Sequence, residues 1–138
     1  TEATKTFRIM AMHGNLVRMK MIKGKIDPSA PEYFTKRTAL HKASYFGHHH
    51  VVEHILSLGG NVVLLDVDGD TPLHDAAKLG HVRCAEMLLD AGAKFNVKNR
   101  NGETPLDLAQ KLDCKDCYDV LKKYANPMNR LKNSMMKM

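Results

Sequence analysis

Short apolar stripes at helical spacing alternate with polar turns that contain glycine along most of the chain. The clearest stripe comprises Val82, Cys84, Ala85, Leu88 and Leu89. Intervals of three and four residues place apolar side chains on one face of a helix, so this segment is predicted to be helical. Gly80 precedes the stripe and Gly92 follows it, and each marks a break because glycine accepts backbone angles that a Cβ would penalise. The pattern predicts an all-α chain of short helices joined by tight turns.

The segment that opens each predicted helix pair recurs at a spacing of 33 residues. It reads TALHKASYFGH at 38–48, TPLHDAAKLGH at 71–81 and TPLDLAQ at 104–110. Three groups of glycines keep the same spacing: Gly14, Gly47 and Gly80; Gly59 and Gly92; Gly69 and Gly102. Self-similarity at one such period indicates an array of one small unit, in which stacking of neighbours completes the core.

The recurring segment also contains the signals that start a helix. Thr71 is placed to cap a helix whose first residue is Pro72, where the missing N–H of proline does no harm. Leu73, Ala76 and Ala77 then supply an apolar face with small residues, which allows close packing against neighbouring units. Each unit is therefore predicted to begin with a short, well-capped helix.

The motif and its period resemble the ankyrin-repeat family over about residues 5–125. The resemblance implies an all-α solenoid of about four 33-residue helix–turn–helix units, with β-turn fingers between them. It also implies that the His74 imidazole bonds to Thr71 and the backbone. We expect one domain at 1–125, with units at about 1–37, 38–70, 71–103 and 104–125, followed by a basic, Met-rich tail or linker at 126–138.

The first and last units depart from the motif, as terminal units of a stacked array should. In the first, residues 5–8 (KTFR) stand where TPLH would be, while Phe7 and Ala11 preserve the packing positions. In the last, Asp107 stands at the position of His74, and Asp113 at that of Gly80. Asn126 is expected to end the last helix, because proline follows it.

The charge distribution limits the classes of partner. The net charge is +6, made up of +5 in 1–37, −3 in 38–70, +1 in 71–103 and +3 in 104–138. This patchy pattern argues against nucleic-acid binding, which favours Lys and Arg clustered along one face. Apolar runs are too short for a membrane span, and no signal peptide is expected from TEATKTFRIM. Three cysteines do not suggest a disulfide framework, so we expect an intracellular, cytoplasmic or nuclear, protein.

Four groups of residues resemble chemical sites but occupy ordinary positions of the repeat. They are Cys114 with Cys117, the run His48–His50, the three acids Asp66, Asp68 and Asp70, and the motif histidines His41 and His74. Zinc needs four ligands, consecutive histidines do not converge on one helical face, and the acids lack the loop and terminal Glu of a calcium site. We therefore expect no enzyme, no metal site and no cofactor.

The resemblance implies that partners contact the turn tips and the exposed positions of the first helix in each unit. The candidate residues are Phe34, Arg37, Asp68, Asp70 and Arg100 on the turns, and Met12, Tyr45, Phe46, Lys78 and Leu79 on the helices. Tyr45 and Phe46 stand out, because packing does not require aromatic residues at these two positions. Two interpretations remain open: they form a binding hot spot with Phe34 and Arg37, or they pack against a neighbouring unit.

We expect a monomeric, non-enzymatic module that binds a partner protein through its concave face and finger turns. With Asp68 and Asp70 beside an apolar strip, a partner with an apolar anchor and a basic flank would fit. One alternative is an accessory domain of a larger enzyme. Another is a binder of RNA or anionic lipid through the basic ends, whose cations include Lys20, Lys23, Lys25, Arg130 and Lys132.

Overall fold

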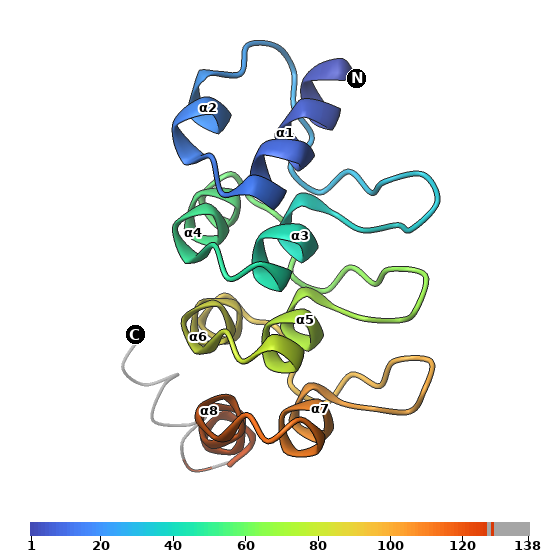
Figure 1. The fold of residues 1–138 in the computed structure, drawn as a ribbon, viewed down its shortest axis with the longest axis vertical. Coiled ribbons are helices and arrows are strands. Elements are labelled where there is room, and N and C mark those ends of the chain that lie inside the picture. Colours follow the sequence, from blue (N-terminus) through green and yellow to red (C-terminus); the bar gives the residue numbers. More distant parts are fainter. Residues whose placement is uncertain (127, 129–138) are drawn as a thin grey trace.

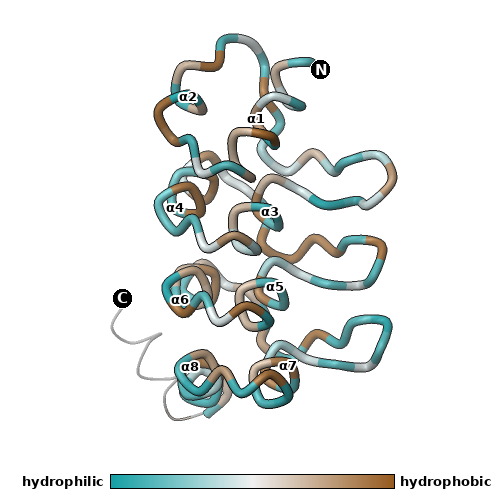
Figure 2. Tube along the Cα trace, in the orientation of Figure 1, coloured by the Kyte–Doolittle hydropathy of each residue, from teal (hydrophilic) through white to brown (hydrophobic). Residues whose placement is uncertain are grey.

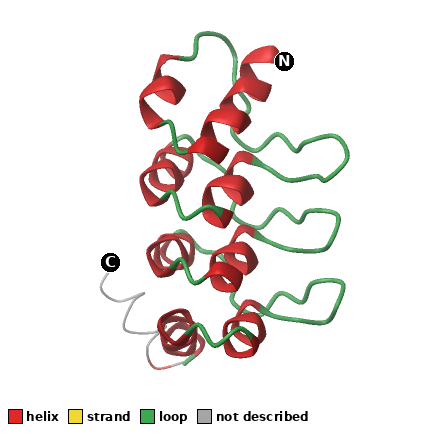
Figure 3. Cartoon of the chain, in the orientation of Figure 1, coloured by secondary structure: helices red, strands yellow, loops and turns green. Residues whose placement is uncertain are grey.

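The computed structural model describes residues 1–126 and 128. These residues form eight α-helices and no β-strand (Figure 3). The helices are α1 (Glu2–His13), α2 (Leu16–Met21), α3 (Ala39–Tyr45), α4 (His49–Ser57), α5 (Pro72–Leu79), α6 (Val82–Asp90), α7 (Pro105–Lys111) and α8 (Lys115–Ala125). The expected tail, including Pro127, Arg130 and Lys132, lies outside the described residues apart from Asn126 and Met128.

The helices stack in two parallel rows (Figure 1). One row contains α1, α3, α5 and α7, the other contains α2, α4, α6 and α8, and consecutive members of a row pack on each other. Three loops project from the first row on one side of the molecule. We call them the first finger (22–38), the second finger (58–71) and the third finger (91–104). The all-α solenoid of four helix pairs predicted from the sequence is confirmed.

One continuous apolar core runs through the stack, between the two rows of helices. Hydrophobic and hydrophilic positions alternate along the helices of both rows (Figure 2). Ala43, Ala76 and Ala109 occupy the same position in three units and are all fully buried, because a small side chain lets neighbouring helices approach closely. Cys117 is also fully buried, which confirms that it occupies a core position of the repeat.

Each of α3, α5 and α7 begins with a reciprocal pair of side-chain bonds. In the second unit the Thr38 side chain accepts the His41 amide N–H, and the His41 imidazole accepts the Thr38 amide N–H. Thr104 and Asp107 form the same pair in the last unit, and these bonds lower the pKa of Asp107. Asp107 therefore preserves the cap that the histidine provides elsewhere.

Histidines after the helix-breaking glycines join neighbouring units. The His81 Nε2 atom lies 3.0 Å from the Tyr45 carbonyl oxygen, and the His48 Nε2 atom lies 3.0 Å from that of Met12. The His81 ring lies so close to Gly47 that a Cβ there would approach it to 2.5 Å. Glycine is needed here both for its positive φ of 74° and for this close approach.

The first unit differs most from the others. α1 begins at Glu2, capped by the Thr1 side chain, and has 12 residues against 7 in α3. Its partner α2 has only 6 residues against 9 in α4. Lys5 stands where Thr38 caps α3, so this position cannot supply the same cap, and α1 instead begins about one turn earlier, at Glu2. Phe7 and Ala11 are nevertheless buried, as predicted.

Candidate functional site

Arg37, a predicted binding residue, is held by one carboxylate of the second unit and one of the third. Its Nη1 atom lies 2.8 Å from an Asp66 oxygen and its Nη2 atom lies 2.8 Å from an Asp75 oxygen. The Asp75 side chain is only 1% exposed, and burial raises its pKa to about 7 although Arg37 acts to lower it. Burial by itself would lower the pKa of Arg37, but Asp75 and Asp66 outweigh it and raise that pKa. Arg37 therefore joins the first finger to the third unit.

Asp70 is also engaged within the chain. One carboxylate oxygen accepts from the Asn99 side chain at 3.0 Å, and the other lies 3.4 Å from the Lys78 Nζ atom. The Asp70 carbonyl oxygen accepts from the His41 Nε2 atom at 2.8 Å. Internal ion pairs and hydrogen bonds thus engage both Arg37 and Asp70, and their contact with a partner stays a prediction.

The three acids of the second finger form a turn, as the repeat position indicated. The Asp66 Oδ1 atom accepts the amide N–H groups of Asp68 and Asp70, both at 2.9 Å. Candidate ligand oxygens of the three residues lie within 4.8 Å of one another. Asp66 and Asp70 nevertheless direct their remaining oxygens at Arg37 and at Lys78 and Asn99. The geometry of this cluster is explained by the turn and its cations.

The two aromatic residues at the end of the second unit's first helix have different surroundings. Tyr45 is half-buried, with the Arg37 guanidinium 5.5 Å from its ring centre and the Phe46 ring edge-on at 5.0 Å. Phe46 is 48% exposed and stacks on the His48 ring at 6.3 Å. Packing within the chain therefore accounts for Tyr45, while Phe46 keeps half of its surface available.

The other predicted contacts fall into three groups. Asp68, Leu79 and Arg100 are exposed, and their contact with a partner stays a prediction. Lys78 is partly covered through its ion pair with Asp70. Phe34 and Met12 meet in a groove that the structure forms at the other end of the concave face.

That groove lies between α1, α3 and the first finger, and has a volume of about 550 Å³. It is lined by Lys5, Arg8, Ile9 and Met12 of α1, by Glu32, Tyr33 and Phe34 of the first finger, and by Lys42 of α3. Apolar side chains remain open to solvent here: Ile9 is 40% exposed, Tyr33 78% and Phe34 83%. Exposed apolar residues that gather around a hollow are typical of binding surfaces.

Polar contacts join the first finger to the two helices that line the groove with it. The Lys42 Nζ atom lies 2.9 Å from a Glu32 oxygen, and this hydrogen bond lowers the pKa of Glu32. The Arg8 Nη1 atom donates to the Ala30 carbonyl oxygen at 3.2 Å, which joins α1 to the finger. The Tyr33 and Phe34 rings lie edge to face at 4.9 Å. The finger is therefore tied to both helices that face it.

The ankyrin-repeat family model, described as three copies of the repeat, matches residues 7–99. The chain belongs to the ankyrin-repeat family. No curated protein sequence matches the chain. Ankyrin repeats are generally protein–protein interaction modules, and none of the described helices is long and apolar enough to cross a membrane.

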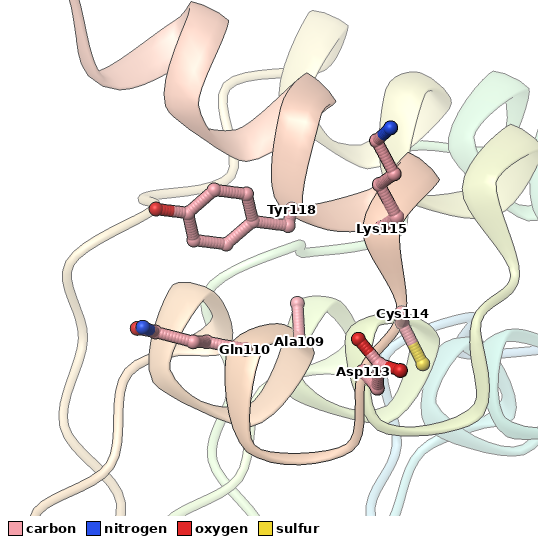
Figure 4. A pocket seen from close by; sticks show the side chains of 6 residues that line it. All are labelled: Ala109, Gln110, Asp113, Cys114, Lys115 and Tyr118. Carbon is pink, nitrogen blue, oxygen red and sulfur yellow. The ribbon is translucent and has the colours of Figure 1, made fainter.

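The fourth ankyrin unit lies beyond the matched residues but continues the same stack, since α7 packs on α5 and α8 on α6. A hollow of about 320 Å³ opens between α7 and α8. It is lined by Ala109, Gln110, Asp113, Cys114, Lys115 and Tyr118 (Figure 4). Gln110 is exposed here, whereas Ala77, its counterpart in the third unit, is fully buried under the next helix pair. The hollow is thus the stacking face that the next unit covers elsewhere in the ankyrin array.

Sequence reasoning missed Lys5, Arg8, Ile9, Glu32, Tyr33 and Lys42 as groove residues. A signal was present for three of them, because positions 5, 8, 9 and 12 follow the spacing of one helical face. The ankyrin motif is lost in the first unit, so the family pattern directed attention to the later units. The position of Tyr33 opposite this face depends on the path of the first finger, which no periodicity indicates.

Proposed function

We propose that this ankyrin-repeat chain binds a partner protein through the groove between α1, α3 and the first finger, together with neighbouring exposed positions of the concave face. The supporting observation is Phe34, which is 83% exposed at the rim of the groove and contacts Tyr33 edge-on. Nothing in the packing of the described residues requires a large apolar side chain at this position. Solvent-exposed aromatic residues beside a hollow are frequent anchors in protein interfaces.

Hydrogen bonds between the fingers support the view that this surface is ordered before a partner binds. The Val67 amide donates to the Thr35 carbonyl oxygen at 2.9 Å, and the Arg100 amide donates to the Asp68 carbonyl oxygen at 3.0 Å. Arg37 adds an ion pair from the first finger to the third unit. A surface that is ordered before binding loses little conformational entropy on association.

Affinity capture followed by quantitative mass spectrometry tests this proposal. Proteins recovered by the parent chain should be lost or strongly reduced with Phe34→Ala and with Ile9→Ala, both of which remove groove surface. Val17→Ala is the matched control, since Val17 is 71% exposed on α2, away from the groove. Thermal unfolding of each variant verifies that it is folded. Equal recovery by the parent and both groove variants would contradict the proposal.

A further inference from the structure

The charges around the groove are predominantly positive. Lys5, Arg8 and Lys42 line it, and Glu32 is the one acidic residue among its lining side chains in the described part of the chain. The Glu32 carboxylate already interacts with Lys42 at 2.9 Å and accepts from the Thr35 hydroxyl at 3.0 Å. The charges of Glu32 and Lys42 cancel each other, so the positive charges of Lys5 and Arg8 remain.

The remaining cations lie near the apolar side chains of the groove. Lys5 is exposed and forms no ion pair within residues 1–126 and 128. Lys36, on the same finger, places its Nζ atom 5.5 Å from the centre of the Tyr33 ring. Ile9 and Phe34 line the same groove as Lys5 and Arg8. A ligand that fills the groove would therefore contact both apolar and cationic side chains.

The positive surface does not extend along the array. In the third unit Lys78 pairs with Asp70, and in the fourth unit Lys111 lies 3.1 Å from Glu103. A nucleic-acid strand would favour a continuous cationic stripe that follows its phosphates. The groove of about 550 Å³ has the size of a pocket for a few residues. Both features favour a short ligand over a long polyanion.

We propose that the groove binds a short acidic segment of the partner protein, with one aromatic or large aliphatic side chain seated against Ile9, Met12 and Phe34. This inference rests on the proposed function and adds the chemistry of the partner. Acidic side chains on either side of the anchor would face Lys5, Arg8 and Lys36. The sequence analysis expected a partner with a basic flank, whereas this proposal gives the partner an acidic one. The reason is that Asp70 is buried and paired while the groove is cationic.

Selection from a random peptide library displayed on phage, with the immobilised chain as bait, tests the inference directly. The enriched peptides should have a net negative charge and share one aromatic or Leu-type residue. A synthetic peptide of the enriched sequence, labelled with fluorescein, then gives the affinity by anisotropy. Lys5→Glu should weaken binding about three- to tenfold, as for reversal of an exposed charge, and Phe34→Ala by about tenfold or more.

Two matched variants separate the groove from general charge and general apolarity. Lys23→Glu makes the same charge change at an exposed residue outside the groove lining, and Val17→Ala removes apolar surface from α2. Both should bind the peptide with unchanged affinity. Single-stranded oligouridine and vesicles containing phosphatidylserine are tested in parallel and should not compete for the groove. The inference would be overturned if no acidic peptide is enriched and the oligouridine or the vesicles bind the parent chain but not Lys5→Glu. The ligand of the groove would then be that polyanion instead of an acidic protein segment.

The outcomes distinguish this inference from the proposed function. If enriched peptides are neutral or basic, or if Lys5→Glu leaves affinity unchanged, the acidic segment is wrong even when Phe34→Ala abolishes binding. In that case a protein-binding groove still stands. If no peptide is enriched and captured proteins are unaffected by both Phe34→Ala and Ile9→Ala, the proposed function itself fails.

Discussion

The Arg37 guanidinium lies 5.5 Å from the centre of the Tyr45 ring, eight residues further along the chain. The same two positions of the repeat hold an ion pair in the following units, Asp70 with Lys78 and Glu103 with Lys111. In each of these three units the contact ties the end of a finger to the helix that follows it. The second unit makes it with a cation over an aromatic face, so Tyr45 has a packing role within the chain.

The Arg37–Tyr45 contact should be measurable as a coupling energy. A double-mutant cycle with Arg37→Met and Tyr45→Leu is expected to give about 0.5–1 kcal/mol of interaction in urea unfolding, as for a partly exposed cation over a ring. The same cycle with Phe46→Leu serves as control, because Phe46 stacks on His48 instead. Equal coupling in the two cycles would show that the contact with Tyr45 contributes nothing specific.

Arg37 should be essential for the stability of the third unit. Arg37→Gln leaves the Asp75 carboxylate buried without its cation, and removing one partner of a buried pair costs about 3 kcal/mol. Adding Asp75→Asn should recover most of that loss in chemical unfolding. Arg100→Gln makes the same substitution at an exposed finger residue and should change stability by less than about 0.5 kcal/mol. A loss in Arg100→Gln as large as in Arg37→Gln would contradict the assignment.

Gly47 and Gly102 form a matched pair for the contact between units. Both have positive φ, 74° and 75°, but a Cβ on Gly47 would meet the His81 ring at 2.5 Å while one on Gly102 would meet nothing within 4 Å. Gly102→Ala should therefore cost about 1 kcal/mol from backbone strain. Gly47→Ala should cost about 1–3 kcal/mol more, because the ring must move and lose its bond to Tyr45. Equal melting temperatures would contradict the close approach.

Acid should destabilise the fold through His41. Burial lowers the pKa of His41 from 6.5 to about 4. Its Nδ1 atom accepts the Thr38 amide N–H at 3.1 Å, and its Nε2 atom faces the Asp70 carbonyl oxygen. A second proton on the ring, at Nδ1, would therefore displace the hydrogen bond from Thr38. Between pH 6.5 and 4 the unfolded chain therefore binds a proton that the folded chain does not. Stability is full above pH 6.5 and falls by about 3 kcal/mol toward pH 4.

Asp75 changes the pH dependence of stability in the opposite direction between pH 4 and 7. The effect of His41 is therefore clearest in a variant that lacks the Asp75 carboxylate. The raised pKa of Asp75, about 7, means that the folded chain binds its proton at a pH where the unfolded chain has released it. Unfolding free energies should therefore fall more steeply with acid in Asp75→Asn than in the parent chain. ¹⁵N NMR of the imidazoles measures His41 directly, and titration near pH 6.5 would refute the prediction.

The sequence predicted those features that recur with the 33-residue period. Gly47 and Gly80, the Thr38 cap and the core position of Cys117 all lie where the repeat placed them, because each depends on a local backbone conformation or on identical neighbours. Arg37 was different. Its main partner, Asp75, is 38 residues away and belongs to a position that holds Lys42 in the preceding unit. No periodic pattern could identify that pair.

The sequence by itself therefore determined the architecture, because helix starts, glycine breaks and apolar stripes act over a few residues and repeat in every unit. Tertiary structure decided which surface residues remain free. Stacking brought Arg37 and Asp70 into internal ion pairs and left Phe34 beside a cationic groove on α1. The physical reason is that side-chain contacts between units depend on how one finger lies against the next helix. The packing of each finger against the next helix decides which side chains are buried and which charges are paired. The spacing of residues along the chain does not specify this packing.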